Sequence, residues 1–340
     1  MKKVYYINVQ GGTGLNVSLA QYITALKAKK PEYEFFVMSP YFDIFQSCEA
    51  VEDVYQPNQA REFLFDAKDK DAKIITTRLY DLSDFIYKRL NYAQAWDELF
   101  DNELFNGKHN VEPSSLSTEL KPLEKFTNLK GQVDEMLKNV KDQGYEDFVI
   151  MQFYGGQSPL TQVPLGEKEE NGKKVQFPDW SKVPYNGDNE PLQRHIPRDV
   201  AAKFIKKFQE THPKTAVVLF QLPNEPGYEN TISFVVPYLA YYEFAKLPEC
   251  RGFVAIDSCL HHLLAGITKG VVIWGHSEPE AFGYSYQRNI VQKCRRADII
   301  YMSLLGPCAN KISYIKPEEL LKEVDDELFG IVEVEAKEEK

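Results

Sequence analysis

Four side chains able to do chemistry follow one apolar run. Residues 253–256 form a β-type run, Asp257 and Ser258 come directly after it, and His261 and His262 follow closely. Open parallel sheets bind their ligands at the carboxyl ends of strands, where the N–H groups of a helix start favour an anion. A carboxylate, a hydroxyl and imidazoles at such an edge predict a binding site for a polar, anionic ligand.

The elements that position these residues form a βαβ unit. Leu260, Leu263 and Leu264 recur at helical spacing, and Gly266 and Gly270 end the short helix. Residues 271–274 then form a second buried strand. An aspartate at the end of a buried strand is costly unless it is paired or bound. The alternative role, that Asp257 or Ser258 only caps the helix, is compatible with binding.

The same stretch resembles the C-terminal signature of glycosyltransferase family 9, the lipopolysaccharide heptosyltransferases. That signature is a strand, Asp-(Ser/Thr)-Gly-x-x-His-Leu-Ala, a short helix, a strand and Gly-Pro-(Thr/Ser)-Asp-Pro. The chain supplies, in this order, Asp257, Ser258, His262, Leu263, Gly275, Ser277 and Pro279. It departs from the signature at Cys259, His276 and Glu278.

The resemblance implies an α/β fold of the GT-B type, with two Rossmann-like domains facing a central cleft. We place the acceptor-side domain at residues 1–143, the nucleotide-sugar domain at 144–330 and a flexible charged tail at 331–340. The implied activity is inverting transfer of a heptose-like sugar from a nucleotide-diphosphate donor, for example an ADP-linked one. The acceptor would be a glycan or lipid-linked glycan. The resemblance implies neither a cofactor nor a metal.

The resemblance also assigns donor-binding roles within the second domain. Arg194 stands just before Ile196-Pro197, where the family has a basic residue that contacts the phosphates, and a guanidinium can bond two oxygens at once. Glu225 follows the strand at 216–222 and would accept bonds from ribose hydroxyls. A solvated arginine and a surface glutamate are the alternatives. The other expected donor-binding residues are Gly155, Gly156, Ser158, Asp257, Ser258 and His262. His261 has no counterpart in the signature and is interpreted as structural.

The chain opens with a strand at 4–9, a glycine loop that contains Gly11, Gly12 and Gly14, a helix and a second strand at 34–38. The loop lacks the Gly-Lys-Ser/Thr of a phosphate-binding loop and the GxGxxG spacing of nicotinamide sites. The glycines of this loop can let the backbone approach a substrate closely, or they can serve only to form a tight turn before the helix. The resemblance places a catalytic aspartate after a glycine here, where this chain has Asn16. Asn16 can orient a hydroxyl but cannot accept its proton, so Asp43, after the second strand, is our candidate base.

Composition narrows the functional classes. The net charge of −10 argues against nucleic acid as a partner. The five cysteines lack metal-ligand spacing, which favours free thiols in a reducing compartment. No leader-like segment opens the chain and no apolar run is long enough to span a bilayer. We therefore expect a cytoplasmic protein, with peripheral contact at the inner face of the membrane as an option.

Two other functions stay open. Residues 11–16 also resemble the Gly-Gly-x-Gly-Asn opening of fucosyltransferases that use a guanine nucleotide, but the His-x-Arg-type motif of that family is missing. A degenerate GT-B domain that binds nucleotide or glycan without catalysis is the alternative from another class, favoured by Asn16 in place of the aspartate. Outside the domains' main elements, residues 166–191 predict an inserted hairpin or loop.

Overall fold

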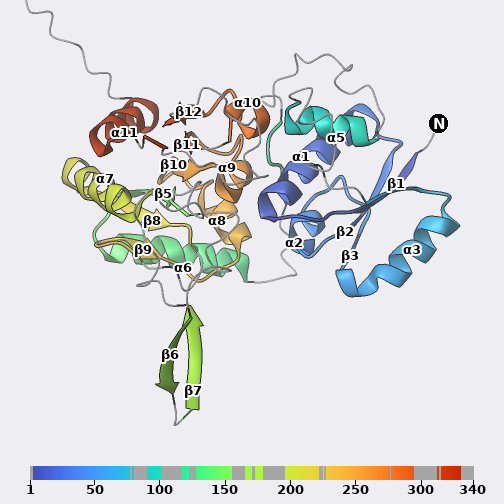
Figure 1. The fold of residues 1–340 in the computed structure, drawn as a ribbon, viewed down its shortest axis with the longest axis horizontal. Helices are drawn as coiled ribbons and strands as arrows, with labels where there is room; N and C mark the ends of the chain where they lie inside the picture. The colour runs from blue at the N-terminus through green and yellow to red at the C-terminus, as the bar shows by residue number, and fades with distance from the viewer. Residues whose placement is uncertain are drawn as a thin grey trace, which may run out of the picture.

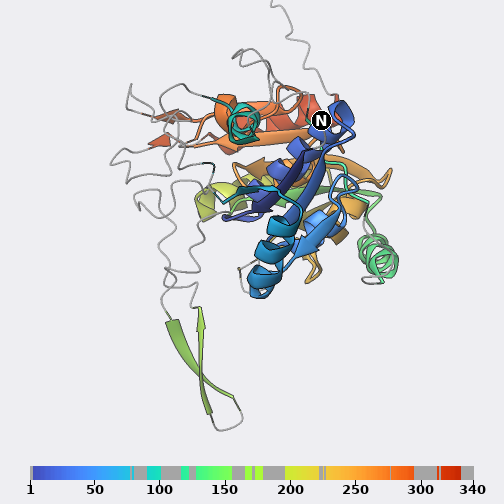
Figure 2. The ribbon, with the colours of Figure 1, turned by 90° about the vertical axis from the view of Figure 1, so that its right-hand side faces the viewer.

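The computed structural model describes residues 3–76, 79, 90–100, 116–121, 128–154, 165–170, 173–178, 196–221, 225, 227–275, 277–294, 312–313 and 315–330. The chain forms two parallel sheets that lie side by side, each with helices on its faces (Figures 1 and 2).

The N-terminal sheet has the strand order β3-β2-β1-β4, and all of its pairs are parallel. Its strands are β1 (Val4–Asn8), β2 (Glu34–Met38), β3 (Asp53–Tyr55) and β4 (Lys73–Ile75). Its helices are α1 (Thr13–Lys29), α2 (Phe42–Gln46), α3 (Ala60–Asp69) and α5 (Tyr92–Phe100), with a 3-10 turn at Pro57–Gln59. Helix α1 begins at Thr13, directly after Gly12, whereas the pattern of apolar residues alone predicts a start near Asn16.

The C-terminal sheet has the order β12-β11-β10-β5-β8-β9, also with parallel pairs throughout. Its strands are β5 (Asp147–Gln152), β8 (Thr215–Leu219), β9 (Ile232–Ser233), β10 (Cys250–Ile256), β11 (Gly270–Trp274) and β12 (Arg288–Val291). Read from β9, the chain order is third, second, first, fourth, fifth, sixth, which is the doubly wound dinucleotide-binding order. The predicted βαβ unit is β10, α9 and β11.

Helices cover both faces of this second sheet. They are α6 (Leu129–Asp142), α7 (Arg198–Thr211), α8 (Tyr238–Phe244), α9 (Cys259–Leu263), α10 (Pro279–Phe282) and α11 (Pro317–Val324), the last continued by a π-helical turn at Asp325–Phe329. Apolar residues of α7 and α11 pack on one face. Helices α6 and α8 pack together on the other, so α6 lies against the C-terminal sheet although it precedes the expected boundary at 143.

One apolar cluster passes from one sheet to the other. It joins the α1 face of the first sheet to β10, α9 and β11 of the second, through residues such as Leu19, Trp96, Leu263 and Trp274. The opposite face of the first sheet has a separate small core, where Phe63 of α3 packs on Tyr6. The two halves therefore share buried surface along α1 and α9.

Two smaller elements complete the description. The first part of the predicted insertion is an antiparallel hairpin, β6 (Leu165–Glu170) with β7 (Lys173–Pro178), which projects away from both sheets (Figure 2). The rest of the predicted insertion, from 179 to 191, lies outside the described residues. A short pair, β13 (Lys293–Cys294) with β14 (Ile312–Ser313), lies near the C-terminal end. The stretch at 298–302, whose sequence also predicts a strand, lies outside the described residues. In the part of the chain that is described, helices with the length and apolar character of a membrane span are absent.

Candidate functional site

The strand order of the C-terminal sheet reverses between β5 and β10. The chain leaves β5 toward β8 on one side and β10 toward β11 on the other, and folds of this order bind their ligands at the carboxyl ends of the strands at such a reversal. Gln152 ends β5, and Asp257 follows β10. Both side chains are buried, at 5% and 6% exposure. The predicted site residue therefore lies at the ligand-binding position of this fold.

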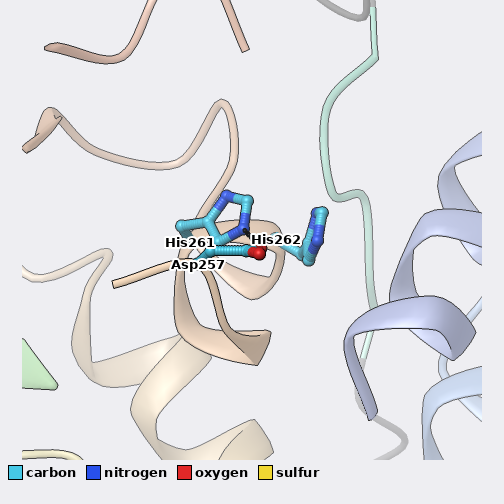
Figure 3. Close-up of side chains that lie close together, drawn as sticks. All are labelled: Asp257, His261 and His262. Atoms are coloured by element: carbon cyan, nitrogen blue, oxygen red, sulfur yellow. Dashed lines mark ion pairs between the residues drawn. The ribbon is translucent and has the colours of Figure 1, made fainter. Parts of the chain in front are cut away.

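The Asp257 carboxylate is held on two sides. The Ser277 hydroxyl, in the segment after β11, donates to Oδ2 of Asp257. Nε2 of His261 lies 3.5 Å from Oδ1 (Figure 3). His261 has no solvent exposure, and neither of its ring nitrogens has a hydrogen-bond partner among the described residues. Sequence reasoning treated His261 as structural and did not foresee its place beside Asp257.

Ser258 occupies the N-cap position of α9, but its side chain makes no capping bond. Nε2 of Gln152 donates to the Ser258 hydroxyl at 3.2 Å, and Oε1 of Gln152 accepts from the Leu260 N–H at 3.4 Å. A residue of the neighbouring strand thus does the capping and holds the start of α9. Sequence reasoning missed Gln152, because its partners are more than 100 residues away.

His262 belongs to a buried network that crosses between the halves. Its Nδ1 lies 2.9 Å from the Tyr284 hydroxyl, and that hydroxyl donates to Oε1 of Gln21 in α1 at 2.8 Å. Since the single hydroxyl proton of Tyr284 is used on Gln21, Nδ1 of His262 must donate to Tyr284. The remaining lone pair of a neutral His262 then lies on Nε2.

Gln21 is the centre of this network. Its Nε2 donates to Thr118 Oγ1 at 2.7 Å and to the His262 carbonyl at 3.1 Å. Its Oε1 also accepts from the Tyr92 hydroxyl at 3.0 Å. Both Nε2 partners act as acceptors, because Thr118 itself donates to the His262 carbonyl at 2.5 Å, and this fixes the orientation of the amide. Hydrogen bonds from Gln21 and Thr118 to the His262 carbonyl thus connect α9, the helix of the predicted donor site, to the N-terminal half.

The glycine loop of the first half faces the second. Gly11 has a φ of +133°, which favours glycine. A Cβ added to Gly14 would lie 3.0 Å from Cδ2 of His262, so the loop can approach α9 because Gly14 lacks a side chain. Gly12, the N-cap of α1, has open space at its Cβ position. The loop therefore meets His262 at Gly14.

Asn16 has no solvent exposure and is used by the loop itself. Its Nδ2 donates to the Gly12 carbonyl at 2.9 Å, and its Oδ1 accepts from the Ser39 hydroxyl at 2.6 Å. These bonds brace the glycine turn against the end of β2. A bond from Asn16 to an acceptor hydroxyl, as the sequence predicts, would need a rearrangement of this loop, and its catalytic role stays a prediction.

Asp43 lies in the first turn of α2 and links the two halves. The hydroxyl of Tyr238, at the start of α8, donates to Oδ1 of Asp43. Burial, followed by this bond to the carboxylate, raises the pKa of Tyr238 far above its ordinary value, so the tyrosine stays protonated.

The other predicted donor residues divide into two groups. Glu225 is buried in the segment after β8, where its carbonyl accepts from Gln221 at 3.2 Å. The remaining donor-binding candidates, Gly155, Gly156, Ser158 and Arg194, lie outside the described residues.

Cys259 is the first residue of α9. Burial raises the pKa of its thiol to about 11, so Cys259 is a neutral thiol at physiological pH.

This chain matches known proteins in its fold but not in its sequence. No family model and no curated protein matches the sequence. Among solved structures, the chain is similar to a glycosyl transferase family 9 protein from Veillonella parvula DSM 2008, with a TM-score of 0.62 and 12% identity over 97% of this chain and 99% of that one.

It is also similar to ADP-heptose lps heptosyltransferase II of E. coli, with a TM-score of 0.60 and 13% identity over 96% of this chain and 99% of that one. At such identities the likeness concerns the fold. The two parallel sheets, the doubly wound order and both full-length matches establish that the chain has the α/β GT-B fold that the sequence predicts.

Proposed function

We propose that this protein is a glycosyltransferase of the family 9 type, which transfers a sugar from a nucleotide-diphosphate donor with inversion. A heptose-like sugar and an ADP-linked donor are the first candidates, with a glycan or lipid-linked glycan as acceptor. A cytoplasmic location at the inner face of the membrane suits such an acceptor. The observation that carries the proposal is Asp257, buried and oriented by Ser277 at the reversal of the doubly wound sheet.

Donor binding follows from the chemistry of that edge. Asp257 can accept hydrogen bonds from sugar hydroxyls, and Glu225 can accept them from the ribose. His262, whose ring lies beside Gly14 of the first half, is the remaining donor-binding candidate on α9. We assign the diphosphate to Arg194 and to the backbone of Gly155 and Gly156, which would stabilise negative charge as the leaving group departs.

In the transfer step, the acceptor oxygen attacks the anomeric carbon from the side opposite the diphosphate. The new carbon–oxygen bond forms as the bond to the phosphate oxygen breaks, and the acceptor hydroxyl loses its proton. We assign this proton to Asp43, with Tyr238 holding the carboxylate in place. The nucleoside diphosphate leaves with the electron pair of the broken bond.

Calorimetry with ADP, GDP and UDP, and with sugars linked to them, tests the binding step. We expect Asp257→Asn to weaken the preferred donor tenfold or more, on the order of one lost charged hydrogen bond. Asp325→Asn is the matched control, since Asp325 also pairs with a histidine, His212, but lies in the π-helical turn after α11. Equal donor affinity in wild type and Asp257→Asn would remove Asp257 from the site.

Activity assays then distinguish the alternatives. A transferase should lose turnover in Asp43→Asn while keeping nucleotide affinity. A preference for guanine nucleotides would support the fucosyltransferase alternative. Binding of a nucleotide sugar with neither transfer nor hydrolysis by wild-type protein would support the non-catalytic GT-B domain, which the bracing role of Asn16 also favours.

A further inference from the structure

Three side chains at the start of α9 converge on one point. One carboxylate oxygen of Asp257 and one nitrogen each of His261 and His262 lie within 4.8 Å of one another, and all three residues are buried (Figure 3). The two imidazole rings lie close, with centroids 3.9 Å apart. The sequence spacing did not predict a metal, because two adjacent histidines fit no familiar ligand pattern.

The gap between His261 and Asp257 is the first indication. At 3.5 Å, Nε2 of His261 and Oδ1 of Asp257 are farther apart than a charge-assisted hydrogen bond, which closes to about 2.8 Å. Two ligands of a tetrahedral Zn²⁺, each about 2.1 Å from the metal, are separated by roughly 3.4 Å. The spacing therefore suits two ligands of one cation better than a hydrogen-bonded pair.

The unpartnered ring of His261 is the second, independent indication. His261 is fully buried, and both of its nitrogens lack a hydrogen-bond partner within the described residues. A buried polar group without a partner costs about 1–3 kcal/mol. A cation bound to Nε2 would remove part of this cost, since that nitrogen already faces Asp257.

The surrounding bonds have the arrangement that metal ligands require. Nδ1 of His262 lies 2.9 Å from the Tyr284 hydroxyl, a bond of the kind that orients the ring of a metal-binding histidine. Ser277 donates to the other oxygen of Asp257 and so orients the carboxylate. Two imidazoles and one carboxylate suit Zn²⁺ and related transition metals, whereas Mg²⁺ and Ca²⁺ prefer oxygen ligands alone.

We propose that Asp257, His261 and His262 form a binding site for one divalent transition-metal cation of the zinc class. The three ligand atoms lie within 4.8 Å of one another, and three protein ligands leave further coordination positions for water or substrate. The inference does not rest on the proposed transferase function, because metal binding can be measured without any substrate. With a metal bound, the three ligands and the cation carry a net charge of about +1, which would favour an anionic donor beside them.

Cobalt titration tests the site in the intact protein. Wild-type protein is treated with EDTA, dialysed and titrated with Co²⁺ under reducing conditions, and the visible absorption of bound Co²⁺ is recorded. We expect one equivalent to bind with the intense bands of a tetrahedral site, and Zn²⁺ to displace it. Less than a tenth of an equivalent bound to wild type would overturn the proposal.

Variants distinguish Co²⁺ binding at this site from Co²⁺ binding by other histidines. His261→Asn and Asp257→Asn should each weaken Co²⁺ binding at least tenfold, whereas His212→Asn, in the pair with Asp325, should leave it unchanged. Circular dichroism checks that each variant is folded. If His261→Asn does not fold, Asp257→Asn still tests the site. Unchanged binding in folded Asp257→Asn, or equal loss in His212→Asn, would contradict the assignment. ADP binding to EDTA-treated protein reports separately on the proposed function.

Discussion

Replacing Gln21 by leucine should destabilise the protein by removing the centre of the network between α1 and α9. Gln21 is 2% exposed, and its Oε1 accepts from the hydroxyls of Tyr92 and Tyr284. Leucine has a similar size but offers no acceptor, so two buried hydroxyl donors lose their partner. At about 1–3 kcal/mol for each unbonded group, with some relief from local rearrangement, we expect a loss of roughly 2–4 kcal/mol.

The free energy of unfolding is measured from urea titrations followed by far-UV circular dichroism at pH 7. Gln21→Glu should recover part of the loss, since a carboxylate can accept from both tyrosines, although it places oxygen against the Thr118 hydroxyl and the His262 carbonyl. Gln143→Leu is the control, because Gln143 is exposed and bonds only within its own helix end. A loss below about 0.5 kcal/mol in Gln21→Leu would refute the view that these bonds hold the halves together.

Two further changes test other parts of the chain. The bond from Lys70, with help from two tyrosines, lowers the pKa of Asp66 to about 2, so its stabilising effect should be complete above the unfolded pKa of about 4 and disappear as the pH falls through 2. The difference in unfolding free energy between wild type and Asp66→Asn, followed from pH 7 to pH 2, checks this, and a difference independent of pH would contradict it. Gly14→Ala should displace the His262 ring by a few tenths of an ångström, which should weaken nucleotide binding while the melting temperature changes little. Gly12→Ala has open space at its Cβ position and should change neither the affinity nor the melting temperature.

The sequence predicted the fold well where strands are buried on both sides. Such strands are continuous apolar runs, as at 253–256 and 271–274, and the structure places β10 and β11 there. The strand β12 was missed, because an edge strand with Arg288 and Asn289 has no such run. The position of Asp257 at the sheet edge followed from the strand that precedes it.

The surroundings of Asp257 were less accessible to sequence reasoning. Gln152, Gln21 and Tyr284 reach the site from distant parts of the chain, and only the packing of strands and helices brings them together. The residue type of Asn16 rules it out as a proton acceptor, and the assignment of the base to Asp43 stays a prediction. The bonds of Asn16 to the glycine loop depend on Ser39 after β2, a pairing that residue types alone cannot specify.

The apolar core shared by the two sheets also determines how the chain can come apart. Side chains of β1 and α1 belong to the same buried cluster as those of β10 and α9, so neither half can melt without uncovering apolar surface of the other. Melting should then be cooperative across both sheets rather than domain by domain. A chain cut between the sheets would leave two fragments, each with a bare apolar face that favours aggregation over independent folding.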